Sequence, residues 1–133
     1  FRRFTMDASY TYLEREVTYD STVLLFNTEA MILPTLPKNK LVFNAFLNLP
    51  HDILALGTFR YEGGLNIQDN TYDPLPPIDS TSHGIVDIGT VVPIYAGASL
   101  QAGIKNLFDR NYFYTPGYPE AGRNWYFNMR YKF

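Results

Sequence analysis

Four tyrosines and one arginine are the residues of this chain that are best suited to binding a ligand. They are Tyr72, Tyr112, Tyr114, Tyr118 and Arg123, and all lie in segments without strand periodicity. A tyrosine presents a rigid apolar ring with one polar tip, and an arginine presents a planar cation that binds anionic groups. The alternatives are that the tyrosines pack within their loops or form an interfacial girdle, and that Asp109 and Arg123 pair or cap the base of the last loop and hold the final hairpin.

The sequence shows no pattern of residues typical of catalysis or metal binding. It has no cysteine, and neither His51 nor His83 has a second histidine at metal-site spacing, so we expect both to be solvated. Asp69, Asp73 and Asp79 are spaced too irregularly for a calcium-binding loop. Neither a Gly-x-Ser-x-Gly nucleophile motif nor a glycine-rich phosphate loop occurs. We therefore predict a protein without enzymatic activity, bound metal or cofactor.

The composition suits a β-sheet with one face towards water and the other towards an apolar environment. Charged residues make up 18%, against about 25% in typical soluble domains, while aromatic residues reach 17%. The formal net charge is −2 and basic residues do not cluster, which argues against a nucleic acid partner. No apolar run approaches the roughly 18 residues of a membrane-spanning helix, so a helical membrane protein is excluded.

Six segments with alternating apolar and polar residues predict the strands that position these loops. The segments span residues 4–12, 41–49, 53–62, 85–92, 98–105 and 125–133. The predicted connections are alternately long and short, with loops at 15–39, 63–83 and 108–124 and turns at 50–52 and 93–97. Bacterial outer-membrane barrels show this rhythm, and strands of about 9–11 residues suit a tilted membrane crossing.

The alternation separates the strand charges from the apolar side chains. The charges Asp7, Arg60, Glu62, Asp87, Lys105, Arg130 and Lys132 all fall on the polar face. A Lys or Arg in contact with lipid at the bilayer centre costs about 2–4 kcal/mol, so this segregation favours an apolar face that meets lipid. The apolar exceptions on the polar face are Leu54, Leu56, Ile85 and Val91. They indicate either contact with a plug inside the pore or an error in the predicted register.

The last predicted strand carries aromatic residues at both ends of its apolar face. That face comprises Trp125, Phe127, Met129, Tyr131 and Phe133. Outer-membrane barrels place girdles of aromatic residues at both membrane interfaces, so this strand fits a membrane crossing. Parity along the strand would point Arg123 towards lipid, and we therefore expect a β-bulge near Gly122.

Short motifs at a defined spacing precede this strand. They are Asn106, Leu107, Phe108 and Asp109, then Tyr112, then Gly117, Tyr118 and Pro119, then Gly122 and Arg123. Together with the alternating strand that ends on Phe133, this series resembles the carboxy-terminal signature of TonB-dependent outer-membrane receptors. The motifs cover about the last quarter of the chain, and the remainder is similar to the family in strand pattern alone.

The resemblance implies an antiparallel transmembrane β-barrel of 22 strands, plugged by an amino-terminal domain, in the bacterial outer membrane. Six strands are too few to close a barrel, and their unpaired edges would find no hydrogen-bond partners in lipid. We therefore expect residues 1–133 to be the last six strands of the barrel, ending on the periplasmic side. The plug domain and the earlier strands would lie outside this chain.

The resemblance also implies the activity and the partners. The protein would bind and import a scarce ligand, most typically a ferric siderophore, with haem, cobalamin, copper or glycans as other substrates of the family. TonB would supply the energy by acting on the absent plug domain. The other expected partners are outer-membrane lipid, the remaining part of the barrel and the barrel assembly machinery, which would recognise the apolar face of the last strand.

Two further interpretations stay open at the level of sequence. A passive outer-membrane channel or a barrel enzyme such as a lipase or protease would have the same strand pattern, and the enzyme would need a paired catalytic constellation. A soluble β-sandwich that binds a ligand would alternate in the same way, because its strands are also half buried. The residues themselves leave the identity of the ligand open.

Overall fold

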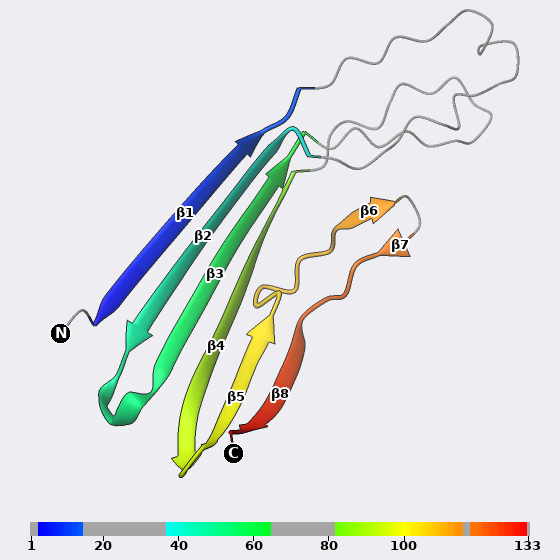
Figure 1. The fold of residues 1–133 in the computed structure, drawn as a ribbon. Coiled ribbons are helices and arrows are strands. Elements are labelled where there is room, and N and C mark those ends of the chain that lie inside the picture. Colours follow the sequence, from blue (N-terminus) through cyan, green and yellow to red (C-terminus); the bar gives the residue numbers. More distant parts are fainter. Residues whose placement is uncertain (1–2, 15–36, 65–81, 116–117, 133) are drawn as a thin grey trace, which may run out of the picture.

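The computed structural model describes residues 3–14, 37–64, 82–115 and 118–132, and it confirms an all-β chain (Figure 1). Its elements are β1 (Phe4–Tyr12), β2 (Asn39–Asn48), the 3-10 helix η3 (Pro50–Asp52), β3 (Leu54–Gly63), β4 (His83–Tyr95), β5 (Ala98–Lys105), β6 (Phe113–Thr115), β7 (Tyr118–Pro119) and β8 (Asn124–Tyr131). Six strands form one antiparallel sheet in the order β1-β2-β3-β4-β5-β8, and β6 pairs with β7 separately. Within the described ranges, no helix is long and apolar enough to cross a membrane.

The six-stranded sheet is a single curved layer that does not close on itself within the part of the chain that is described. Figure 1 shows η3 and the β4–β5 turn at one end of the sheet, which we call the turn end. The β6–β7 hairpin lies at the opposite end, which we call the loop end. Both termini lie near the turn end, and the order of the strands follows the sequence apart from the hairpin.

All six predicted strands are present, and two predicted connections need correction. The turn expected at 93–97 is tighter, because β4 runs to Tyr95 with a register shift between Pro93 and Tyr95. Such an irregular step tolerates proline, which has no backbone N–H for the ladder. Gly97 then reverses the chain with a φ of 83°, a left-handed conformation that favours glycine. The loop expected at 108–124 contains the β6–β7 hairpin.

The strand register places apolar residues of neighbouring strands opposite one another. Phe43 on β2 pairs with Phe59 on β3. Ile104 on β5 lies between Ile88 on β4 and Trp125 on β8. Because directly opposite residues share a face, the predicted apolar stripes form one continuous surface across the sheet.

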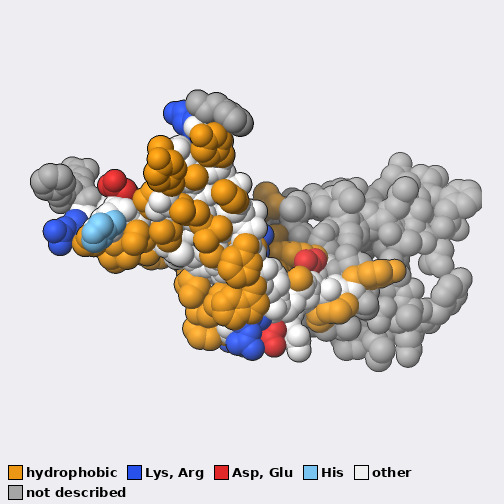
Figure 2. All heavy atoms as spheres, turned by 90° about the horizontal axis from the view of Figure 1, so that it is seen from below, with side chains coloured by type: hydrophobic (Ala, Val, Ile, Leu, Met, Phe, Trp, Pro, Cys, Tyr) orange, Lys and Arg blue, Asp and Glu red, His pale blue; other side chains and the backbone are white. Residues whose placement is uncertain are grey.

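No second layer of described residues covers this apolar face. Its exposed large side chains are Phe4, Met6, Tyr10, Tyr12, Leu47, Phe59, Tyr61, Ile88, Leu100, Trp125, Phe127, Met129 and Tyr131. Figure 2, viewed from the turn end, shows hydrophobic side chains gathered over the sheet with charged side chains at its margins. Among the described large apolar residues only Ile85, at 2% exposure, is buried, so this part of the chain has no hydrophobic core of its own.

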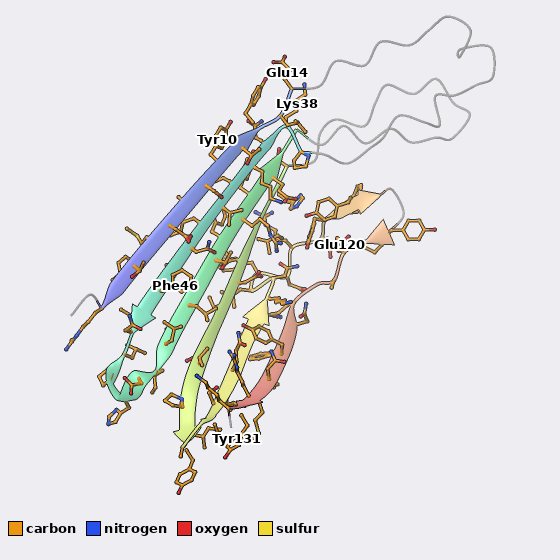
Figure 3. All side chains as sticks on the ribbon, viewed as in Figure 1. Tyr10, Glu14, Lys38, Phe46, Glu120 and Tyr131 are labelled. Atoms are coloured by element: carbon orange, nitrogen blue, oxygen red, sulfur yellow. The ribbon has the colours of Figure 1, made fainter. Side chains whose placement is uncertain are left out.

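The polar face carries the apolar exceptions that the sequence indicated, so the predicted register is confirmed there. Leu54 pairs with Val91, and Leu56 pairs with Phe46 on β2. Figure 3 shows Phe46 on β2 towards the turn end. Contact of these residues with a plug stays a prediction.

Tyr126 lies against two glycines on the same polar face. A Cβ built on Gly103 would come within 2.6 Å of the Tyr126 ring and 2.5 Å of the Ile88 carbonyl oxygen. A Cβ on Gly89 would come within 2.6 Å of the Tyr126 hydroxyl. The Lys105 ammonium lies 5.7 Å from the centroid of this ring, within the range of a cation–π interaction. The glycines therefore make room for an aromatic ring that joins β4, β5 and β8.

We predict that Gly103→Ala destabilises the protein by about 1–3 kcal/mol, the usual cost of overpacking. Two neighbours would have to move, and the Ile88 carbonyl belongs to the ladder itself. Equilibrium unfolding in urea would measure the change. The matched control is Gly57→Ala, whose Cβ would meet nothing closer than the Asp87 carbonyl oxygen at 4.0 Å. Equal destabilisation by both substitutions would contradict the role given to Tyr126.

Candidate ligand-binding site

A cluster of polar and aromatic side chains lies on the polar face at the loop end of the sheet. Its members are Lys40, Glu62, His83, Tyr112 and Tyr114, and we call it the loop-end cluster. Strand register sets three of them side by side, since Glu62 on β3 is opposite Lys40 on β2 and opposite His83 on β4. The two tyrosines come from the segment that follows β5, and Tyr114 belongs to β6.

Glu62 is the centre of this cluster and is only 3% exposed. One carboxylate oxygen lies 3.0 Å from the Lys40 ammonium. The other accepts a hydrogen bond of 2.6 Å from the Tyr114 hydroxyl and lies 3.5 Å from Nε2 of His83. A buried carboxylate is costly unless it is paired and hydrogen-bonded, and here both of its oxygens have partners.

His83, Tyr112 and Tyr114 form a compact group of rings over this carboxylate. The rings of His83 and Tyr112 are stacked with their centroids 4.5 Å apart. The Tyr114 ring stands edge-on to each of them at 5.7 Å. Such edge-to-face and stacked pairs contribute about 0.5–1.5 kcal/mol beyond the area they bury.

The phenol groups of the cluster are held in their neutral form. Burial raises the pKa of Tyr114, and its hydrogen bond to Glu62 and the negative charge of that carboxylate raise the pKa further. Burial likewise raises the pKa of Tyr112, and the negative charges of Glu120, Asp87 and Glu62 add to the effect against the opposing charge of Arg60. Both hydroxyls therefore keep their proton near neutral pH, and that of Tyr114 donates to Glu62.

A second polar group links the cluster to the turn after β5. The Arg60 guanidinium lies 3.6 Å from one carboxylate oxygen of Asp87, and the other oxygen accepts a hydrogen bond of 2.8 Å from the backbone N–H of Asn106. Asn106 is itself buried at 3% exposure. Its side chain donates to the carbonyls of Arg110 and Ala121 and accepts from the Arg110 N–H.

The motif residues that carry the family resemblance hold the base of the last loop. Asn106 and Asp109 adopt positive φ angles of 51° and 53°, which asparagine and aspartate tolerate better than most residues. The Asp109 carboxylate accepts a hydrogen bond of 2.7 Å from the backbone N–H of Arg123. A Cβ on Gly122 would lie 2.7 Å from the same carboxylate oxygen, so a glycine fits there. The motif thus fixes the geometry of a turn.

The structure brings together two of the residues that the sequence suggested for ligand contact, Tyr112 and Tyr114. Tyr118 lies apart on β7 and is 73% exposed. Arg123 is an exposed residue whose backbone, rather than its guanidinium, meets Asp109. Tyr72 lies outside the described residues. Figure 3 labels Glu120 beside the hairpin, and its N–H donates to the Tyr112 carbonyl at 2.9 Å.

Two expectations at this site were wrong. His83 was expected to be solvated but is 9% exposed, because the Tyr112 ring covers it. A β-bulge was expected near Gly122, yet the β5–β8 ladder has no register shift. The chain bends at Arg123 and β8 starts at Asn124. Arg123 therefore lies outside the strand, and the alternation of faces along β8 does not determine its direction.

Sequence reasoning also missed that Glu62, His83 and Lys40 would meet. Each of the three residues stands at the end of the polar face of its strand, and this position could be read from the sequence. Once the register is known, it places residues of adjacent strands directly opposite one another. No sequence period, however, predicts that Tyr112 and Tyr114 fold back over them. The Nδ1 atom of His83 is buried and has no hydrogen-bond partner among the described residues.

Glu62 and His83 are buried, so the parts of the cluster that reach its surface are the Lys40 ammonium and the half-buried rings of Tyr112 and Tyr114. A cation beside aromatic faces suits the binding of a polar ligand with flat surfaces. No group of three or more His, Cys, Asp or Glu residues within the described ranges is arranged to hold a metal ion. No family model matches the sequence.

We predict that Tyr114→Phe destabilises the protein by about 1.5–3 kcal/mol, because it removes a hydrogen bond to a buried carboxylate. The raised pKa of Tyr114 means that this contribution is present below the ordinary tyrosine pKa of about 10 and is lost as pH rises through the raised value. Urea unfolding at neutral pH and at strongly alkaline pH would measure both effects. The exposed residue Tyr118 provides the control, since Tyr118→Phe should change little; an equal loss in both variants would refute the assignment.

Proposed function

We propose that this chain is the carboxy-terminal part of a TonB-dependent outer-membrane transporter, which binds a scarce ligand and imports it with energy supplied through TonB. The observation that supports this most is the continuous apolar face of the sheet, which no described residue covers. The signature motifs between Asn106 and Arg123 add the resemblance to this family. A ferric siderophore is the ligand class that the resemblance favours.

The energetics of the apolar face favour lipid as its cover. Burying a side chain the size of Phe or Met stabilises a protein by about 1.5–3 kcal/mol relative to leaving it in water. Phe127 and Trp125 on the edge strand β8 are 69% and 66% exposed, and Phe59 and Leu100 on inner strands are each 36% exposed. A soluble β-sandwich would supply a second sheet over this surface, and the described residues form a single layer.

The edges of the sheet favour a larger barrel. β1 and β8 each pair with one neighbour only within the described part, which leaves a row of backbone N–H and C=O groups along each outer edge. Lipid offers no hydrogen-bond partner to such groups, so membrane sheets close into barrels. The missing partners would be the earlier strands of a 22-stranded barrel, in keeping with the family.

In this proposal, the loop-end cluster contacts the ligand at the outer mouth of the pore. It lies on the polar face, which would line the interior, and at the end of the sheet that bears the β6–β7 hairpin. The phenol donors, the His83 ring and Lys40 supply groups that recognise a polar, partly aromatic ligand. The absent plug domain and other loops would complete the site.

We predict that adjacent residues of β8 face opposite solvents. Residues 1–133 contain no cysteine. In the full-length protein with any cysteine elsewhere replaced, Phe127→Cys and Asn128→Cys can each carry one environment-sensitive fluorophore after reconstitution in vesicles. Brominated lipids should quench the label at 127 strongly and the label at 128 weakly, because successive side chains of a strand point to opposite faces. Quenching that is equal at both positions, or stronger at 128, would rule out a lipid-facing apolar stripe.

Loss of the full-length gene is expected to abolish TonB-dependent uptake of a radioactively labelled ferric siderophore. In a complemented strain, Tyr112→Ala should raise the apparent Kd about tenfold, which corresponds to about 1.4 kcal/mol of lost binding. The Tyr118→Phe strain serves as the control at equal surface expression. Unchanged uptake of every siderophore tested in the deletion strain would exclude this ligand class.

A further inference from the structure

A groove opens on the apolar face at the loop end of the sheet. It has a volume of about 490 Å³, within the range of ligand pockets, and it borders the loop-end cluster at His83. The other lining residues are Phe59, Tyr61, Ser82, Gly84, Val86, Phe108 and Arg110. We call it the loop-end groove. Phe59, Tyr61 and Val86 also belong to the apolar stripes of β3 and β4, so the groove continues the surface that faces lipid in the proposed function.

The groove exists because β4 extends beyond its neighbour β5. The last Cα pair between these strands is Ile88 with Ile104, whereas β4 continues to His83. Beyond that pair, the Leu107 N–H donates to the Val86 carbonyl, and the chain then turns away.

The turn brings Phe108 and Arg110 to the side of β4. Gly84 has no side chain and therefore leaves space at the floor of the groove. A Cβ on Gly84 would already come within 3.1 Å of the Phe59 ring. Phe108 is 69% exposed although it stands beside other apolar side chains. An apolar ring in this position gains from any occupant that removes it from water.

Arg110 gives the groove one positive end. Its backbone N–H is bonded to Asn106, so the turn holds the residue by its main chain and leaves the guanidinium to other contacts. No Asp or Glu of the described residues lies within ion-pair distance of this guanidinium. Guanidinium groups bind phosphate through two parallel hydrogen bonds, which makes a phosphate the matching anion.

We propose that the loop-end groove binds a membrane lipid with an anionic phosphate headgroup, with the phosphate on Arg110 and an acyl chain against Phe59, Val86 and Phe108. The combination of a cation at the rim and apolar walls continuous with the lipid-facing stripe fits an amphiphile better than a soluble anion. This inference rests on the proposed function, because only a sheet in a bilayer presents this face to lipid. The bound lipid would anchor the base of the last loop at the outer of the two membrane–water interfaces.

The test uses the full-length protein in phosphatidylcholine vesicles that contain a minor fraction of phosphatidylglycerol. Native mass spectrometry of the released protein would compare the retention of the two lipids. We expect preferential retention of phosphatidylglycerol and a roughly tenfold loss of that preference in Arg110→Gln, which removes the charge-assisted hydrogen bonds. Phe108→Ala, a change at an exposed side chain, should lower the retention of both lipids.

Arg130→Gln is the matched control, since Arg130 pairs with Ser99 near the turn end and on the polar face. Its preference should equal that of the unaltered protein. Equal retention of both lipids by the unaltered protein, or an equal loss of preference in Arg110→Gln and Arg130→Gln, would overturn the inference. The quenching experiment at positions 127 and 128 separates the two proposals: normal membrane insertion without lipid preference refutes the groove alone, and failed insertion refutes both.

Discussion

The structure depends on one constraint: the strands of the sheet present an apolar face that no described residue of the chain covers. Ile85 is the only large apolar residue of the described ranges that is buried, and it lies on the opposite face. A hydrophobic core therefore cannot hold this segment together as it does a soluble domain. Its order comes from the backbone ladders and from contacts on the polar face, while the apolar face needs a cover from outside, for which lipid is our proposal.

The polar face supplies the specific contacts that the apolar face lacks. At the loop end, Glu62 joins Lys40, His83 and Tyr114, and these contacts tie three strands and the hairpin segment together. Towards β8, Tyr126 covers glycines on β4 and β5. Buried polar contacts of this kind are costly when incomplete, so they favour a single arrangement of strands and loop. The residues that would line a pore are thus also those that fix the sheet.

The strands could be predicted because the alternation of apolar and polar residues is a local property of the sequence. Strand pairing then keeps residues of the same face opposite one another. β1 and β5 match their predicted bounds, and the exceptions Leu54 and Val91 proved to be a cross-strand pair rather than an error of register. The hairpin was not predictable, since β6 and β7 are 3 and 2 residues long and show no period. The burial of His83 was missed for a related reason. It depends on a ring from the segment after β5, and no periodicity encodes such long-range contacts.

The motif residues and the aromatic residues of the loop-end cluster have different roles in the structure. Asn106 and Asp109 use their side chains on backbone groups of the loop base, so residues of these types at this spacing specify a turn rather than a ligand contact. Tyr112 is carried by that turn to a place above His83. Proteins that share the motif could therefore share the turn and still bind different ligands, because the side chains carried by the turn are free to differ. In the function we propose, the aromatic and charged residues at the loop end would determine which ligand binds, while the turn beneath them carries the resemblance to the family.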